Sequence, residues 1–101
     1  MEYYKIKPNP YLKNLICLYV EDEEQIRESF TLMIKRYFKE VITAKNGQEG
    51  FEKFKKHSPD IVISDIRMPV MDGIKMVTEI KSLKPDSFVI FITAFSDLEY
   101  L

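Results

Sequence analysis

Four short, largely apolar runs, each followed by polar residues and a longer stretch with helical spacing, constrain the fold of this chain more than any other feature. The runs cover residues 15–20, 41–44, 61–64 and 88–92. A run that is apolar throughout, rather than at alternate positions, is typical of a strand buried on both faces of a parallel sheet. Strands that alternate with helices are joined by right-handed crossovers. The sequence therefore predicts an α/β domain whose parallel sheet is covered by helices.

The stretches between these runs have apolar residues at three- and four-residue spacing, with charged residues such as Arg27 and Lys35 elsewhere. Asn46 is a plausible cap for the second helix, and Lys84-Pro85 should end the third. One face of the first helix carries Ile26, Phe30, Met33, Ile34 and Tyr37, the second helix carries Phe51 and Phe54, and Met76, Val77, Ile80 and Leu83 mark the third.

Composition excludes several classes of protein. A chain of 101 residues with 46% hydrophobic and 31% charged residues fits one globular domain, not a disordered or membrane chain. Its 15 basic and 16 acidic residues nearly cancel, so no overall basic field indicates nucleic-acid binding. No segment approaches the roughly 18 apolar residues of a membrane span, and residues 1–14 lack a signal-peptide core. With a lone cysteine, Cys17, we expect a cytoplasmic protein, organised as an extension over residues 1–14 and a domain over residues 15–101.

Polar residues follow three of the predicted strands. Glu21 and Asp22 follow the first, Asp65 follows the third, and Thr93 follows the fourth. Parallel strands place their carboxyl ends on one edge of the sheet, where ligands bind in open α/β folds. Carboxylates that meet there repel one another unless a cation lies among them. Oxygen ligands without a nearby His or Cys suit Mg²⁺ and phosphoryl chemistry better than zinc or acyl transfer.

Each of these residues also has a simpler interpretation. Glu21 and Asp22 begin a helix, where acids interact favourably with the helix dipole. Asp65 alone could form a turn, and Thr93 alone could be an ordinary strand residue. The joint pattern, with every polar group on the same predicted edge, favours a shared site.

Several segments resemble the receiver domain of two-component response regulators. They are residues 18–23 (LYVEDE), 65–73 (DIRMPVMDG) and 92–94 (ITA), and residues 46–49 (NGQE) resemble the start of the family's second helix. They occur in the family's order and at its intervals, from about Leu15 onward. The resemblance implies a flavodoxin-like, doubly wound, three-layer fold with strand order 2-1-3-4-5, of which this chain would hold 2-1-3-4.

The resemblance also implies roles for the clustered residues. Asp65 would accept a phosphoryl group from the phosphohistidine of a sensor histidine kinase or phosphotransfer protein, or from a small donor such as acetyl phosphate. Asp22, Asp65 and the backbone carbonyl of Arg67 would bind Mg²⁺, while Glu21 would act through water. Thr93 would follow the phosphoryl oxygen and alter contacts with other proteins. Such a domain is a signalling switch that catalyses its own phosphorylation and dephosphorylation, not a classical enzyme.

Two residues near the expected acceptor are bulky. Arg67 and Phe95 stand two positions beyond Asp65 and Thr93. The resemblance to receiver domains implies that these positions lie close to the path that an attacking water would take. We therefore expect the phosphoryl group to be shielded and long-lived.

Parts of the family pattern would lie beyond Leu101, including a fifth strand, a fifth helix and a lysine that contacts the phosphoryl group. Lys75, Lys81 and Lys84 fall on the third helix or its end, so none takes that lysine's role. The apolar strand over residues 88–92 would be a sheet edge, which invites pairing with another chain. We expect a fragment of a longer regulator, or a homodimer or domain swap. Nucleic acid would be contacted only through an output domain outside these residues.

Two other functions remain open. A pseudo-receiver would act as a dimerisation or binding module without phosphorylation. A phosphatase of the haloacid-dehalogenase type would also use an aspartyl nucleophile and Mg²⁺. That family needs an acid two positions after the nucleophile, where this chain has Arg67, and its nucleophile follows the first strand rather than the third.

Overall fold

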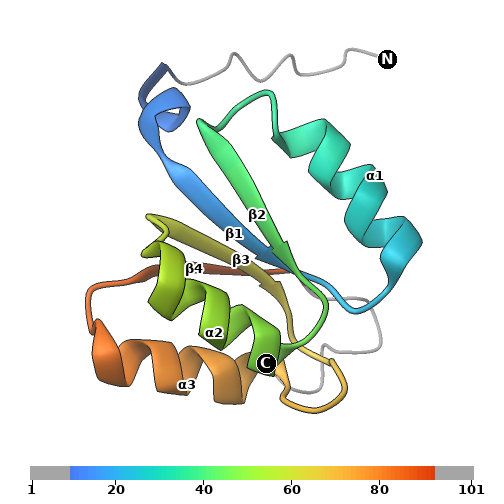
Figure 1. Cartoon of the computed structure of the whole chain (residues 1–101), viewed down its shortest axis with the longest axis vertical. Coiled ribbons are helices and arrows are strands. Elements are labelled where there is room, and N and C mark those ends of the chain that lie inside the picture. Colours follow the sequence, from blue (N-terminus) through green and yellow to red (C-terminus); the bar gives the residue numbers. More distant parts are fainter. Residues whose placement is uncertain (1–9, 93–101) are drawn as a thin grey trace, which may run out of the picture.

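The computed structural model describes residues 10–92, which form a four-stranded parallel sheet with helices on both faces (Figure 1). The strand order is β2-β1-β3-β4, so the predicted order is confirmed. In chain order the elements are a 3-10 helix at Pro10–Asn14, β1 (Ile16–Val20), α1 (Glu24–Ile34), β2 (Glu40–Ala44), α2 (Gly47–His57), β3 (Ile61–Asp65), α3 (Gly73–Leu83) and β4 (Phe88–Ile92).

The register of the strands sets where the polar ends meet. β1 lies at the centre, with Val20 beside Ala44 of β2 and Ser64 of β3. On the outer side of β3, Asp65 pairs with Ile92 of β4. The residues that follow β1 therefore lie at the same edge as the last residues of β3 and β4.

Strand alternation divides the core into two clusters, one on each face. On the face covered by α2 and α3, Leu18, Val20 and Val62 pack with Phe54, Met76 and Ile80. On the α1 face, Cys17, Tyr19, Ile61 and Ile63 pack with Ile34 and Phe38. The predicted three-layer arrangement is confirmed. Burial also raises the pKa of the Cys17 thiol to about 12, as expected for a cysteine that acts as a small apolar core residue.

Parts of the predicted apolar faces of α1 and α3 are exposed to solvent. Helix α1 ends at Ile34, so Tyr37 lies beyond it. Ile26 and Met33, on the predicted apolar face of α1, are 47% and 53% exposed. Leu83, at the end of α3, is also exposed. Helical spacing marks the apolar side of a helix, whereas burial depends on which neighbouring elements lie against that side.

Side-chain caps fix where α2 and α3 begin. Asn46 Oδ1 accepts the Glu49 backbone N–H at 2.8 Å, which confirms the predicted cap. Asp72 Oδ1 accepts the Lys75 N–H at 2.8 Å in the same way. Each bond satisfies a backbone donor that a helix leaves without an internal partner.

Strand β4 lies at the edge of the described sheet, and its exposure alternates. Phe88, Ile90 and Ile92 are 61%, 41% and 39% exposed, whereas Val89 and Phe91 on the opposite face are partly buried. Phe88 and Ile90 pair with Ile61 and Ile63, so the exposed side chains belong to the α1 face. Among residues 10–92, no helix is long and apolar enough to cross a membrane.

Candidate phosphoryl-acceptor site

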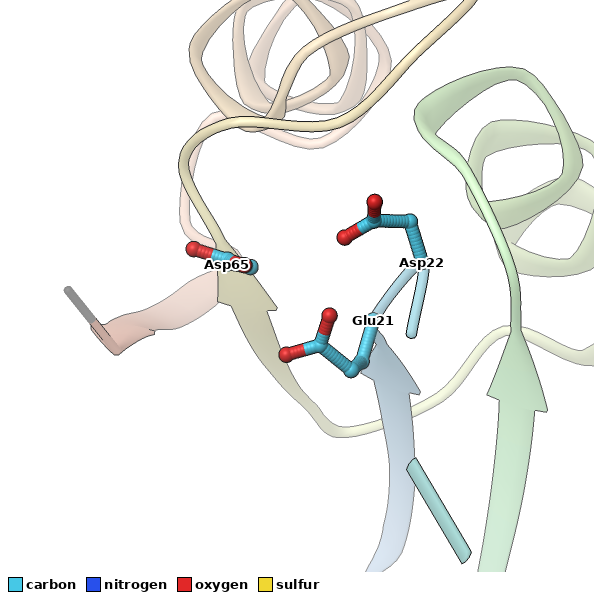
Figure 2. Close-up of side chains that lie close together, drawn as sticks. All are labelled: Glu21, Asp22 and Asp65. Carbon is cyan, nitrogen blue, oxygen red and sulfur yellow. The ribbon is translucent and has the colours of Figure 1, made fainter. Parts of the chain in front are cut away.

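Three carboxylates meet at the carboxyl ends of β1 and β3 (Figure 2). Each of Glu21, Asp22 and Asp65 offers an oxygen, and these oxygens lie within 4.8 Å of one another. Glu21 and Asp22 directly follow β1, and Asp65 is the last residue of β3. The parallel topology thus brings together acids that are more than forty positions apart in the sequence.

Glu21 has a raised pKa in this cluster. Its side chain is buried, with 7% of the residue exposed. Burial raises the pKa of Glu21 to about 7, with further contributions from a hydrogen bond to Asp22 and from the charges of Asp65 and Asp22. The Glu23 N–H, which donates to Glu21 Oε2 at 3.0 Å, opposes this rise in pKa. The site therefore carries an excess of negative charge that a cation would relieve.

Backbone contacts hold Asp65 at the start of a loop. The Ile66 N–H donates to Asp65 Oδ1 at 2.8 Å, and the Gly73 N–H donates to the Ile66 carbonyl at 2.7 Å. A Cβ atom on Gly73 would lie 2.1 Å from the Asp65 carbonyl oxygen, so a side chain there would collide with backbone. The Asp72-Gly73 pair seen in the sequence thus has two separate roles, a helix cap and a close backbone approach.

The loop between β3 and α3 is tightly turned and tied to α2. The Met71 N–H donates to the Pro69 carbonyl at 2.7 Å across Val70, whose φ is +70°. A three-residue turn closed by such a bond, with positive φ at its central residue, is the less common form of the γ-turn. The Gly47 N–H donates to the Met71 carbonyl at 2.9 Å. These bonds connect the segment after Asp65 to the start of α2.

Arg27, on α1, contacts the loop that carries Glu21 and Asp22, although helical spacing places it only off the apolar face of its helix. Its Nη1 donates to the Glu21 carbonyl at 2.8 Å, with a longer contact of 3.4 Å to the Asp22 carbonyl. Helical side chains lean toward the amino terminus of their helix, so an arginine in the early turns of a helix can reach the loop before it. The position of Arg27 shortly after two acids was the available signal.

The other predicted site residues are not all described. Arg67 is exposed in the loop after Asp65. Thr93 and Phe95 lie outside the described residues. Lys75 and Lys81 lie on α3 and Lys84 follows it, as predicted, and the Lys81 ammonium donates to the carbonyls of Pro85 and Ser87.

The residues present fit a magnesium ion. All three donors are carboxylates, the oxygen ligands that Mg²⁺ prefers, and the group contains no His or Cys that would favour zinc. Burial, together with the neighbouring charges of Asp65 and Asp22, raises the pKa of Glu21, and a cation beside these acids would oppose that rise. Asp22 and Asp65 are partly exposed, which leaves room for the waters that Mg²⁺ retains.

Comparison with known proteins identifies the family. Residues 17–101 match the response regulator receiver domain. The transcriptional regulatory protein LnrK of Bacillus subtilis is 40% identical over 79 residues, which are 76% of this chain and 36% of LnrK. The chain therefore spans about a third of that relative's length.

Two solved structures extend the comparison to three dimensions. The N-terminal domain of an uncharacterized protein from Wolinella succinogenes is 42% identical with a TM-score of 0.78, over 85% of this chain and 69% of that one. The response regulator TrrA of Thermotoga maritima, solved in complex with Mg²⁺ and beryllofluoride, is 36% identical with a TM-score of 0.78, over 85% of this chain and 75% of that one.

The chain belongs to the response regulator receiver domain family of two-component signalling. Receiver domains are typically signalling switches rather than classical enzymes, and they work through contacts with other proteins such as kinases. Four parallel strands in the order 2-1-3-4, alternating with helices, are the receiver fold, so the predicted fold and family are confirmed. The division into an extension over 1–14 and a domain over 15–101 stays a prediction.

Proposed function

We propose that this chain is the phospho-accepting receiver of a two-component phosphorelay and that Asp65 is the acceptor. The observation that carries the proposal is the meeting of Glu21, Asp22 and Asp65 at one sheet edge in a chain of this family. A carboxylate at the end of β3, fixed by its neighbour's N–H, is accessible to a donor from outside the domain. The other two acids supply the negative charge that would hold a cation beside it.

The proposed step is an in-line transfer of a phosphoryl group. An Asp65 carboxylate oxygen forms a bond to phosphorus while the bond from phosphorus to the imidazole nitrogen of the donor's phosphohistidine breaks. The imidazole leaves with the electron pair of that bond. Such a transfer needs placement and charge stabilisation more than covalent help from the protein. The chain's own contribution is therefore to hold Asp65 in line and its neighbours in place.

Mg²⁺ is the proposed cofactor, and it would neutralise negative charge on the transferring phosphoryl group. Asp22, Asp65 and the Arg67 carbonyl would hold it, while Glu21 would contact it through water. TrrA, a similar protein, was solved with Mg²⁺ and beryllofluoride, which supports Mg²⁺ as the cofactor. We expect Thr93 to change position with the phosphoryl group and thereby alter protein contacts, and Arg67 with Phe95 to shield that group from water.

The proposed partners are a sensor histidine kinase or a phosphotransfer protein, which would present the phosphohistidine to the edge that carries Asp65. We expect the domain to work in the cytoplasm, where receiver domains usually act. The buried free thiol of Cys17 agrees with a reducing compartment. Any nucleic-acid contact would require an output domain beyond these residues.

Acetyl phosphate offers a direct test that needs no kinase. We expect the protein to gain the mass of one phosphoryl group in the presence of Mg²⁺ and not after chelation. The Asp65→Asn variant should gain nothing, because the nucleophilic oxygen is replaced by an amide. The Asp86→Asn variant, with the same change at an exposed aspartate before β4, is the matched control and should react like wild type.

The same experiment separates the alternative functions. A pseudo-receiver would form no adduct with or without Mg²⁺. A phosphatase would release inorganic phosphate over many turnovers rather than accumulate one adduct per chain. Modification of wild type and Asp65→Asn alike would refute Asp65 as the acceptor.

A further inference from the structure

Arg27 joins helix α1 to the loop that carries two of the three acids. Its guanidinium donates to the Glu21 carbonyl at 2.8 Å and approaches the Asp22 carbonyl at 3.4 Å. Its backbone N–H donates to the Glu23 carbonyl at 2.8 Å. All three residues between β1 and α1 therefore have a carbonyl oxygen close to a donor of this one residue.

The loop needs such a contact because sheet pairing stops at its beginning. The Glu21 N–H still donates to the Ala44 carbonyl at 3.0 Å, continuing the β1–β2 ladder. Beyond that bond, the orientation of the Glu21 and Asp22 peptides depends on contacts outside the sheet. Because each peptide orientation sets the direction of the adjoining side chain, the Arg27 contact also helps to direct these two carboxylates.

The positive charge of Arg27 and its contacts with the loop should have opposite effects on cation binding. Burial raises the pKa of Tyr19, the charges of Glu21 and Asp65 raise it further, and the Arg27 guanidinium lowers it, so the arginine and the acids act on the same small region. A positive charge this close to a cation site repels a second cation. If Arg27 acted by charge alone, its removal would strengthen Mg²⁺ binding.

We propose that Arg27 is a positioning residue, which fixes the β1–α1 loop so that Glu21 and Asp22 are held ready for the cation. This inference rests on the proposed function, since it assumes that the acids bind Mg²⁺. It assigns to Arg27 a net favourable effect on that binding despite its charge. Residues that orient metal ligands commonly contribute about 10- to 100-fold to metal affinity.

The Arg27→Met variant tests the proposal, with Lys35→Met as the matched control. Both residues lie along the same groove of about 480 Å³ between α1 and β2, and both substitutions remove one positive charge. Mg²⁺ dissociation constants measured by calorimetry at fixed ionic strength should rise about tenfold for Arg27→Met. The constant for Lys35→Met should stay the same or fall slightly. Binding by Arg27→Met that equals or exceeds that of wild type would overturn the proposal.

A second variant covers the possibility that Arg27→Met does not fold. Arg27→Lys keeps the charge but replaces the planar guanidinium, whose Nη1 contacts both carbonyls, with an ammonium on a flexible chain. We expect its Mg²⁺ affinity to fall below that of wild type, and an unchanged affinity would overturn the positioning role. Circular dichroism shows which variants are folded.

Amide hydrogen exchange without metal separates this inference from the proposed function. The Glu23 N–H, bonded to Glu21 Oε2, reports the order of the loop. Its exchange rate should be several-fold higher in Arg27→Met than in wild type, and the same in Lys35→Met as in wild type. Equal exchange in all three proteins would refute the role of Arg27, whether or not Mg²⁺ binds. Wild-type protein that binds no Mg²⁺ would refute the proposed function instead.

Discussion

The two faces of the sheet are built from the same apolar strands but are covered to different extents. On the α2/α3 face, Leu18, Val62 and Ile80 are almost completely buried, and two helices pack over β1 and β3. On the α1 face, Phe88 and Ile90 of β4 are largely exposed. In Figure 1, α1 lies near β1 and β2, whereas β4 lies on the far side of β3 from them.

This difference shows that strand composition and strand burial are separate properties. β4 is as apolar as β1, yet its residues on the α1 face have no covering helix among residues 10–92. The flank of α1 that faces away from β2 is also open, along a groove lined by Ile26, Phe30 and Met33. We therefore expect the α2/α3 face to supply most of the stability, and the α1 face to be available for a further contact.

The largest expected effect compares two methionines on opposite faces. Met76 is fully buried in α3, whereas Met33 is about half exposed on α1. Met76→Ala should lower the free energy of unfolding by about 3 kcal/mol, because it removes buried apolar atoms and leaves a cavity. Met33→Ala should change it by less than about 0.5 kcal/mol. Equal losses in denaturant unfolding would remove the contrast between the two faces.

The next effect concerns Glu21. It follows Cys17 and Tyr19 at the two-residue spacing that places side chains of β1 on the α1 face. Its pKa of about 7 in the folded protein lies above its ordinary value of 4.5, so the folded state binds more protons between these two values. The free energy of unfolding should therefore fall, on the order of 2 kcal/mol, as the pH rises from about 4.5 to about 7, and then level off.

Two comparisons isolate this contribution from other titrating groups. Glu21→Gln should remove the fall, because the amide does not titrate, and Mg²⁺ should reduce it in wild type by stabilising the ionised acid. Unfolding curves for wild type and Glu21→Gln that change in parallel with pH would contradict the assignment.

The smallest expected effect on folding stability comes from the exposed side of β4. Ile90→Lys should change the unfolding free energy of the monomer only slightly, because the side chain already reaches solvent. It should nevertheless weaken self-association, since we expect a second copy to cover the α1 face in solutions of this 101-residue chain. Leu83→Lys, at an exposed position on α3, is the control and should leave association unchanged.

Light scattering over a range of concentrations measures this association. Wild type and Leu83→Lys should approach the mass of a dimer as the concentration rises, while Ile90→Lys stays close to a monomer. A wild-type chain that remains monomeric at high concentration would contradict coverage by a second copy.

Much of the fold could be predicted because its signals are local. Continuous apolar runs located all four strands, and the side-chain amide of Asn46 marked the start of α2. The exposure of Ile26 and Met33 on the apolar face of α1 could not be predicted, because helical periodicity contains no information about what packs against a helix. That information depends on elements distant in the sequence.

The candidate site could be predicted only in part for a related reason. The rule that parallel strands share a carboxyl edge was enough to bring Glu21, Asp22 and Asp65 together. The contact of Arg27 with the loop carbonyls depends on the path of the chain between β1 and α1, which no local pattern specifies. Thr93 and Phe95 lie outside the described residues, so their roles stay predictions.

The central claim is that Asp65 accepts a phosphoryl group in a magnesium-dependent way. Its most direct test is the binding of beryllofluoride, a phosphoryl mimic, followed by fluorine and amide NMR. The account predicts a bound fluoride signal only with Mg²⁺, shifts of the amides of residues 21–23 and 65–67, and loss of both in Asp65→Asn. A bound fluoride signal that appears without Mg²⁺, or that persists in Asp65→Asn, would contradict the claim. The absence of any bound signal in wild type would contradict it as well.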